Sequence, residues 1–278
     1  MSKRYLHIGS WNIEHFSKYG GRKENVFALT EHIEMAGLDL LVMQELYITG
    51  GVERGKPRNK DLDQVVRLLE EHTGKTWNYE LFRKRKLTDA KQTCGILWNA
   101  DVIDKLDTYR IPVATKMEGG NLWDRIPHAV KFKYAQKTDF VVIPIHMKSN
   151  VRKKGGLAPQ TLRFHEALTL VDQLTDVRTR LSDNDIIILG DTNCKNAKEK
   201  ALKVFVDAGF KDLNSADAGT FVNSKAPFDH IFVPNAEKEF LYSRQYNMIS
   251  ANQDDHDKWL SDHFLVKTMI KIRVDDDQ

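Results

Sequence analysis

One apolar run constrains the fold of this chain more than any other stretch. Residues Asp185–Leu189 read Asp-Ile-Ile-Ile-Leu, Gly190 ends the run, and Asp191, Thr192 and Asn193 follow. A short, β-branched run of this kind predicts a buried strand rather than a helix. Because residues two apart in an extended chain point to the same side, we expect Asp191 and Asn193 to face one cleft. Ligands bind at such strand ends in open α/β sheets, although Gly, Asp, Thr and Asn are also ordinary turn residues.

Strand-like runs alternate with helical patterns near both ends of the chain, and strands dominate between. The runs predict strands at 5–12, 38–43, 77–82, 94–98, 103–109, 129–134, 140–146, 185–189, 231–233 and 263–272. Helical patterns predict helices at 24–36, 61–72, 160–181 and 197–208, and loops at 49–59 and 148–159. We therefore expect two packed sheets with helices outside, in a single domain over 1–272 followed by an acidic tail at 273–278.

Composition excludes several protein classes. Apolar content of 41% and charged content of 29% are globular values, and no apolar run is long enough to span a membrane. The first residues lead into a strand-like run with no signal-peptide pattern. The two cysteines, Cys94 and Cys194, are too few for a disulfide framework or a zinc site. We therefore expect reduced thiols in a cytoplasmic protein, with no membrane contact and no evident obligate protein partner.

The basic residues are unevenly distributed. A net charge of +3 does not by itself imply nucleic acid, but basic side chains gather in three stretches. They are Arg54, Lys56, Arg58 and Lys60; Arg83, Lys84, Arg85 and Lys86; and Lys148, Arg152, Lys153 and Lys154. A solvated surface is the simpler interpretation of each stretch taken alone.

Polar side chains end several of the predicted strands. These positions are Asn12, Glu14, Glu45, His146, Asp191, Asn193, Asp229, His230, Asp262 and His263. A single carboxylate after a strand means little, but repeated examples along the whole chain are difficult to explain as turns. Oxygen ligands without cysteine favour Mg²⁺ or Mn²⁺ over zinc. Histidines with carboxylate partners suit proton transfer and contact with a phosphoryl oxygen.

This set resembles the endonuclease/exonuclease/phosphatase superfamily, the deoxyribonuclease-like fold. The matching segments, in the family's order, are Trp11-Asn12-Ile13, Gln44-Glu45, Ile145-His146-Met147-Lys148-Ser149, Gly190-Asp191-Thr192-Asn193, Phe228-Asp229-His230-Ile231 and Ser261-Asp262-His263. The resemblance implies an α/β (α+β) fold, a four-layered α/β/β/α sandwich of two mixed β-sheets flanked by helices. It also implies divalent-metal-dependent hydrolysis of phosphodiesters or phosphomonoesters at the strand ends.

The resemblance also implies roles for individual residues. Glu45 would be the main metal ligand, with Asn12 and Asp262 close to it. Asp191 would orient or deprotonate the attacking water, and Asn193 would hold the phosphate or that water.

Further implied roles concern the phosphate. His263, paired with Asp229, would contact the scissile phosphate or transfer a proton, and His146 would be a second phosphate donor. Arg125 matches a less constant arginine near the phosphate. Lys148 and Arg152, in the basic loop after His146, would neutralise backbone phosphates without reading sequence.

Simpler interpretations remain open for several of these residues. Either catalytic histidine could be a hydrogen-bonded core residue, Asp229 a turn residue and Glu14 a surface acid, while Arg125 could form an ordinary ion pair. We expect His230 and Thr220 to be structural, and Trp77, Trp98 and Trp123 to belong to the core or its rim.

The substrate is the least constrained part of the prediction, because a fold does not determine function. The basic loop favours a nucleic-acid substrate. Together with the site that the resemblance implies, it favours a Mg²⁺-dependent endonuclease (Mn²⁺ as second metal) that cleaves DNA with little sequence specificity, and RNA stays open as substrate. The alternatives are a phosphatase or phosphodiesterase for a small-molecule, lipid or protein-linked (tyrosyl-DNA) phosphate, and a non-catalytic nucleic-acid-binding relative. Two departures from the family pattern are Leu46-Tyr47 after Glu45, and no evident acid for His146 near Cys94-Gly95-Ile96.

Overall fold

A computed structural model describes most of the chain. The described residues are 5–17, 25–53, 55–82, 92–135, 138–152, 154–214, 218–235, 239–249 and 256–273. Three expected features lie outside or partly outside them: the basic stretch 83–86, the basic residues Arg54 and Lys153, and most of the acidic tail. None of the helices in the described ranges is both long and apolar enough to cross a membrane.

The first sheet brings the two ends of the chain together. Its strand order is β15-β17-β1-β2-β6-β5, with β16 also paired to β17. The strands are β1 (Tyr5–Asn12), β2 (Leu40–Leu46), β5 (Trp77–Leu81), β6 (Thr93–Asn99), β15 (Phe240–Tyr242), β16 (Tyr246–Met248) and β17 (Leu265–Ile272). Only β1 and β2 run parallel, so the sheet is mixed.

The second sheet contains the apolar run that ends at Gly190. Its order is β13-β14-β12-β11-β10-β7, and only β11 and β12 run parallel. The strands are β7 (Ile103–Arg110), β10 (His128–Tyr134), β11 (Thr138–His146), β12 (Ile186–Asp191), β13 (Phe210–Asp212) and β14 (Asp229–Pro234). Two small hairpins lie apart from both sheets: β3 (Val52–Glu53) with β4 (Lys56–Pro57), and β8 (Lys116–Met117) with β9 (Gly120–Asn121).

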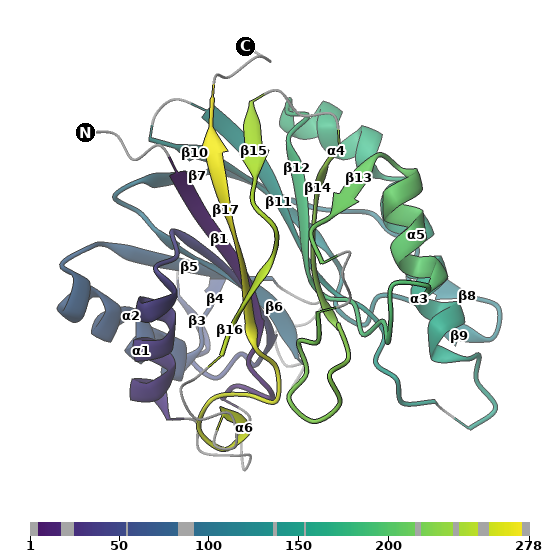
Figure 1. Cartoon of the computed structure of the whole chain (residues 1–278), viewed down its shortest axis with the longest axis horizontal. Helices are drawn as coiled ribbons and strands as arrows, with labels where there is room; N and C mark the ends of the chain where they lie inside the picture. The colour runs from purple at the N-terminus through teal and green to yellow at the C-terminus, as the bar shows by residue number, and fades with distance from the viewer. Residues whose placement is uncertain are drawn as a thin grey trace.

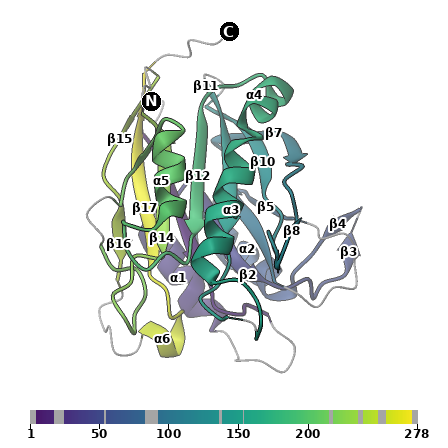
Figure 2. The same cartoon turned by 90° about the vertical axis from the view of Figure 1, so that its right-hand side faces the viewer.

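Helices cover the outer face of each sheet and complete four layers (Figure 1). The helices are α1 (Val26–Ala36), α2 (Lys60–Thr73), α3 (Pro159–Val171), α4 (Leu174–Leu181), α5 (Lys200–Asp207) and α6 (His256–Trp259). α1 and α2 pack on the first sheet, and α3, α4 and α5 pack on the second (Figure 2). The predicted α/β/β/α sandwich of two mixed sheets is therefore confirmed.

The run before Gly190 lacks polar alternation because both of its faces are buried. Ile186 and Ile188 pack against the helices, whereas Ile187 and Leu189 pack against the first sheet. Strands with a layer on each side read as continuous apolar runs. The absence of alternation thus reports the position of β12 in the interior of the sandwich.

Caps set the ends of the first two helices. The Asn25 side chain accepts a hydrogen bond from the Ala28 N–H, and the Asn59 side chain accepts one from the Leu62 N–H. Each of these helices ends at a glycine in the left-handed region, Gly37 and Gly74. Both helices were predicted, from their apolar positions, to within two residues of their ends.

Three element predictions were wrong in detail. The helix expected over 160–181 is two helices, because the Gln173 N–H bonds the Leu170 carbonyl three residues back and turns the chain. No Gly or Pro marks that break. The loop expected at 49–59 contains the β3–β4 hairpin, and the short strands β8, β9, β13, β15 and β16 were not predicted. Runs of two or three residues carry too little periodicity to be recognised.

Candidate active site

The chemistry-bearing residues meet at one end of the sandwich because of the strand directions. The parallel pairs β1–β2 and β11–β12 place Asn12, Glu45, His146 and Asp191 at their carboxyl ends. β14 runs antiparallel to β12, so its first residue, Asp229, lies opposite Asp191. β17 runs antiparallel to β1, and the segment just before it carries the remaining acid and histidine.

Asp191 lies at the centre of the cluster. Its Oδ2 atom accepts a hydrogen bond from Asn12 Nδ2 at 2.9 Å, and lies 3.4 Å from His146 Nε2 and 4.0 Å from His263 Nε2. Its Oδ1 atom accepts the Asn193 backbone N–H at 2.7 Å. The structure therefore brings these five residues together from four separate stretches of the chain.

Gly190 allows the approach of the strand end to β11. Its φ is 148°, and a Cβ added there would lie 1.9 Å from the carbonyl oxygen of Ile145. Only glycine tolerates both conditions. Asn193 follows with a φ of 55°, and its side-chain amide donates to the Met147 carbonyl at 3.2 Å. Its side chain therefore turns toward the end of β11.

Glu45 is aimed into the site by an irregularity in β2. The pairing of β2 with β6 shifts register between Met43 and Leu46, and Glu45 has a φ of 62°. Its Oε2 atom accepts the His15 backbone N–H at 3.0 Å and a hydrogen bond from the Gln92 side chain. Its Oε1 atom lies 3.4 Å from Asn12 Nδ2 and 3.9 Å from His146 Nε2.

The acid near His146 was not evident in the sequence, and the structure supplies it. Asp191, from the neighbouring strand β12, lies close to His146 Nε2, and Glu45 is slightly more distant. Strand order, which a sequence scan does not contain, decides the partner.

His263 forms a buried pair with Asp229. His263 Nδ1 donates to Asp229 Oδ2 at 2.8 Å, and the same oxygen accepts the Thr220 hydroxyl at 2.6 Å. The rings of Phe221 and Phe228 lie 5.1 Å and 5.9 Å from the imidazole centroid. Burial lowers the pKa of His263, but Asp229, followed by Asp191 and Asp262, outweighs it and raises that pKa to about 10. The ring is therefore an imidazolium at neutral pH.

Two carboxyl groups of the site have raised pKa values. Burial, assisted by Asp229 and opposed by His263, raises the pKa of Asp191 to about 6. Burial, with repulsion from Glu14, Glu45 and Asp191, raises the pKa of Asp262 to about 7 although His263 opposes the shift. Glu14, which could have been a simple surface acid, thus belongs to an acidic cluster whose repulsion a bound cation would relieve.

The oxygen donors of this cluster suit a hard cation but do not form a closed cage. Among the residues that the structure describes, no group of three or more His, Cys, Asp or Glu side chains is arranged to hold a metal ion. Mg²⁺ is usually held by one or two carboxylates together with several waters. Glu45 lies 3.4 Å from the Asn12 carboxamide nitrogen and repels the Asp262 carboxylate, so these three side chains are the ones that would hold such an ion.

The expected basic rim is partly neutralised by neighbouring groups. The Lys148 ammonium lies 2.6 Å from Asp124 Oδ2, and Arg125 donates to the Met147 carbonyl at 2.8 Å. Arg58 pairs with Asp63 and stacks over Tyr79, so it belongs to the α2 end. Arg152 is exposed and donates to the Gly156 carbonyl at 3.3 Å. Lys148 is thus buried and paired, while Arg152 keeps a solvent-accessible charge.

A charged network beneath the site was not recognised in the sequence. Arg163, fully buried on α3, donates to the Lys148 carbonyl, to Asn150 Oδ1 and bidentately to Glu199. The Asn150 side chain then donates to the Asn193 carbonyl at 3.0 Å. The sequence signal for this network was an arginine among the apolar positions of a helix. A surface helix usually carries arginine on its polar face, so an arginine on the apolar face indicates a buried partner.

Glu166, one turn further along α3, supports the same segment. Its two carboxylate oxygens accept the backbone N–H groups of Trp123 at 2.7 Å and Lys148 at 2.8 Å. Burial raises its pKa to about 7 despite these bonds. The end of β11 is therefore held from below by α3.

The remaining predictions concern structural residues. His230 pairs with Asp212 at 2.9 Å, away from Asp191, as a structural role requires. Thr220 also orders the site, through its hydrogen bond to Asp229. Trp77, Trp98 and Trp123 are buried, and both cysteines are buried free thiols.

Comparison with known proteins gives matches at the level of structure. No protein-family model matches the sequence, and no curated protein matches it. An endonuclease/exonuclease/phosphatase family protein from Bacteroides thetaiotaomicron is 17% identical, with a TM-score of 0.65 over 97% of this chain and 98% of that one. A mannosyl-6-phosphatase from B. thetaiotaomicron VPI-5482 is 17% identical, with a TM-score of 0.63 over 95% and 99%.

A third solved structure holds nucleic acid. D. rerio TDP2, complexed with single-strand DNA product, is 14% identical, with a TM-score of 0.64 over 96% of this chain and 98% of that one. Identities this low establish the likeness of the fold alone. The fold is therefore that of the endonuclease/exonuclease/phosphatase superfamily, as the sequence resemblance predicted.

Proposed function

We propose that this chain, which has the fold of the endonuclease/exonuclease/phosphatase proteins, is a divalent-metal-dependent phosphoester hydrolase. The observation that carries the proposal is the cluster around Asp191, whose Oδ2 atom has one carboxamide and two imidazoles within 4.0 Å. Hydrolysis of a phosphoester needs an oriented water, neutralised phosphate charge and help for the leaving oxygen. The cluster contains a residue suited to each requirement.

Asp191 is the proposed base or orienting group for the attacking water. Its raised pKa, about 6, lies close to neutral pH, where a general base is most effective. Asn193 follows on the same strand end and is proposed to hold that water or the phosphate. Asn12 fixes the Asp191 carboxylate through its side-chain amide.

The two histidines are the proposed donors to the phosphate. His263 is held as an imidazolium by Asp229, so Nε2 can donate to a phosphoryl oxygen or to the leaving group. His146 lies on the other side of Asp191 and supplies a second donor. Arg125 and Arg152 are proposed to contact the substrate outside the Asp191 cluster. Lys148 is proposed to bind the substrate as well, through the ammonium group that pairs with Asp124.

A divalent cation fits the acidic cluster. Glu45, Asp262 and Asn12 would hold it, with Mg²⁺ as the proposed ion and Mn²⁺ as an alternative. When bound, such an ion polarises a phosphoryl oxygen and stabilises developing charge. The support for this assignment is the mutual repulsion of the carboxylates around Asp262.

The proposed substrate is DNA, cleaved internally with little sequence specificity; RNA is the second nucleic acid to test. Exposed cations after β11, Arg152 and Lys154, suit sequence-independent contacts with backbone phosphates. The similar fold of D. rerio TDP2 in complex with a DNA product supports this choice. The comparably similar mannosyl-6-phosphatase supports the alternative, a phosphatase or phosphodiesterase for small phosphoesters.

Nicking of supercoiled plasmid in Mg²⁺ or Mn²⁺ tests the proposal. We expect Asp191→Asn to reduce nicking by about 100-fold to 10,000-fold, because the water loses its base, and we expect EDTA to abolish it. Asp207→Asn, on the exposed face of α5, is the matched control and should cleave like the wild type.

The same assay separates the alternatives. If the plasmid stays intact and 4-nitrophenyl phosphate is hydrolysed, the protein is a phosphatase and the nuclease proposal is wrong. DNA binding without turnover in any metal would instead identify a non-catalytic nucleic-acid-binding protein.

A further inference from the structure

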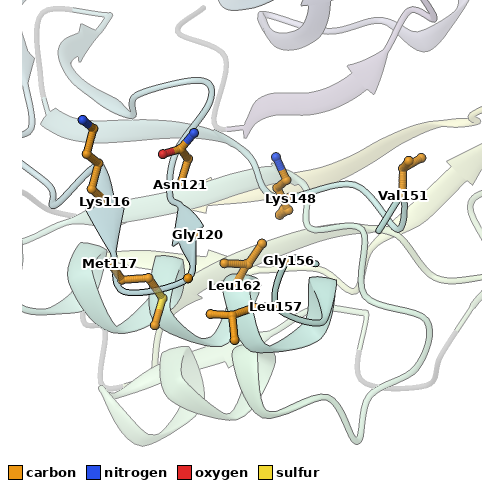
Figure 3. A pocket seen from close by; sticks show the side chains of 10 residues that line it. Lys116, Met117, Gly120, Asn121, Lys148, Val151, Gly156, Leu157 and Leu162 are labelled. Atoms are coloured by element: carbon orange, nitrogen blue, oxygen red, sulfur yellow. The ribbon is translucent and has the colours of Figure 1, made fainter. Parts of the chain in front are cut away.

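A pocket of about 290 Å³ opens beside the candidate active site. It lies between the β8–β9 hairpin, the segment after β11 and the segment that leads into α3 (Figure 3). The lining residues that matter here are Lys116, Met117, Asn121, Lys148, Leu157 and Leu162. Lys148 follows His146 by two residues, so the pocket and the site share one stretch of chain.

The pocket has an apolar side and a polar side. Figure 3 shows Leu157, Leu162 and Met117 together on one side, with the polar ends of Lys116, Asn121 and Lys148 on the other. Lys116 is exposed, whereas Lys148 is buried and bonded to Asp124 at 2.6 Å. A ligand here would rest an apolar face on aliphatic side chains and meet a carboxamide and two ammonium groups along one edge.

Close packing fixes the shape of the pocket. A Cβ added at Gly120 would lie 2.5 Å from Leu162 Cδ2, so the hairpin rests directly on the side of α3. The backbone of Lys148 is held from below by Glu166 and Arg163. Both walls are therefore anchored to the same helix, and the pocket is part of the folded framework.

We propose that this pocket receives the nucleoside esterified to the phosphate that the active site hydrolyses, an inference that rests on the proposed function. Its volume suits one unpaired nucleoside, so cleavage of duplex DNA requires that nucleoside to leave the base stack. The aliphatic floor would contact the face of a base, and Asn121, with both donor and acceptor, would bond its edge. A sugar phosphate could bond the polar side, but its remaining hydroxyls would face the apolar side chains of Met117, Leu157 and Leu162 without hydrogen-bond partners.

Turnover of two phosphodiesters that share the same leaving group, 4-nitrophenolate, tests this assignment. They are thymidine 5′-(4-nitrophenyl phosphate) and methyl 4-nitrophenyl phosphate, which has no nucleoside. We expect Leu157→Trp, which fills the pocket, to raise KM for the nucleoside ester by about tenfold or more. Its kcat for that ester, and both constants for the methyl ester, should stay within about twofold of the wild type.

The matched control is Leu106→Trp on β7. Leu106 is 50% exposed and does not line the pocket, so its replacement adds the same indole elsewhere. It should behave like the wild type with both esters. Equal KM values for the nucleoside ester in Leu157→Trp and Leu106→Trp would overturn the inference.

Calorimetric binding separates the pocket from catalysis. Thymidine 5′-monophosphate should bind wild type and Leu106→Trp about tenfold more tightly than inorganic phosphate or glucose 6-phosphate do, and Leu157→Trp should lose this advantage. No advantage in the wild type, or one that survives Leu157→Trp, would refute a nucleoside pocket. If neither ester is hydrolysed, the result counts against the proposed function. The binding measurement would still show whether the pocket accepts a nucleoside.

Discussion

Two buried aspartate–histidine pairs lie close together in the fold, and only one of them reaches the Asp191 cluster. Asp229 holds His263 at 2.8 Å, and Asp212 holds His230 at 2.9 Å. The first histidine turns its other nitrogen toward Asp191, while the second stacks on Phe232 in the interior. Similar local chemistry therefore serves two purposes, and position relative to the strand ends decides which.

This pairing predicts different results for two similar substitutions. Asp229→Asn should lower kcat by at least about 100-fold, because the imidazole that faces the substrate loses the carboxylate that orients and charges it. Asp212→Asn should leave kcat within about twofold of the wild type and cost about 1–3 kcal/mol of stability, because it alters a buried pair outside the site. Turnover with a 4-nitrophenyl phosphodiester and urea unfolding measure the two effects.

The comparison with Asp212→Asn excludes a purely structural explanation. If both variants lost the same activity in proportion to their loss of stability, Asp229 would have no catalytic role. A normal kcat in Asp229→Asn would likewise contradict the proposed function of His263.

A buried histidine at the start of β10, His128, predicts acid sensitivity. Burial, partly opposed by a bond to the Ile126 carbonyl, lowers the pKa of His128 to about 4, and its ring stacks on Phe82. The unfolded chain has the ordinary pKa, about 6.5, so the unfolded state takes up the proton first as pH falls. Stability from neutral His128 is therefore complete above pH ~6.5 and is lost as pH falls toward 4.

His128→Phe should flatten this loss while keeping the stack on Phe82. Between pH ~6 and ~4.5, we expect the slope of the unfolding free energy to fall by up to about 1.4 kcal/mol per pH unit. His32, whose pKa burial and the nearby His256 also lower to about 4, keeps its own contribution. Urea unfolding across this range measures the slope, and an unchanged slope would mean that burial does not lower the pKa of His128.

At the scale of elements, the end of β12 depends on one residue, Gly190, for its close approach to β11. A side chain at Gly190 would collide with the Ile145 carbonyl in a backbone conformation that other residues rarely adopt. The collision involves backbone of the parallel neighbour β11, which cannot move without displacing His146. Strand pairing and the geometry of the candidate site therefore depend on the same glycine.

Gly190→Ala should destabilise the protein by about 3 kcal/mol or more, because strain and overpacking add at this position. Gly37→Ala is the matched control: its φ is also positive, but no atom lies within 4 Å of the added methyl group. The control should cost only about 1 kcal/mol. Thermal unfolding of the two variants gives the comparison, and equal losses would show that the contact with Ile145 relaxes easily.

The helices and long strands were predictable because their signals are local. Asparagine caps and terminal glycines mark α1 and α2, and uninterrupted apolar runs mark β11 and β12. The break between α3 and α4 was not predictable, because no Gly or Pro marks the turn at Gln173, whose N–H bonds the Leu170 carbonyl. Arg163 and Glu166 also escaped prediction, since their partners lie on other elements.

At the scale of the whole molecule, the two sheets share one interior. Ile8 and Val42 of the first sheet pack in the same cluster as Val142 and Ile187 of the second. The candidate site is built from both sheets, with Asn12 and Glu45 from one and His146 and Asp191 from the other. We therefore propose that residues 1–272 form one cooperative domain.

This proposal predicts a single unfolding transition. Far-ultraviolet circular dichroism and tryptophan fluorescence should give coincident urea curves, since Trp98 packs between the sheets and Trp123 packs on the helix side of the second sheet. Two separated transitions would mean that the sheets unfold independently. They would also mean that the interface between the two sheets, across which the site is built, is weaker than a shared core implies.

The sequence by itself determined the sandwich, its principal elements and the identity of the polar residues at the strand ends. Apolar periodicity and caps are encoded within a few neighbouring residues, and the family motifs recur in order along the chain. Only the tertiary structure decided that Asp191 approaches His146, that Arg163 lies beneath the site and that Lys148 is neutralised by Asp124. Those contacts join residues on different helices, strands and loops, and chain packing, not local sequence, sets which of them meet.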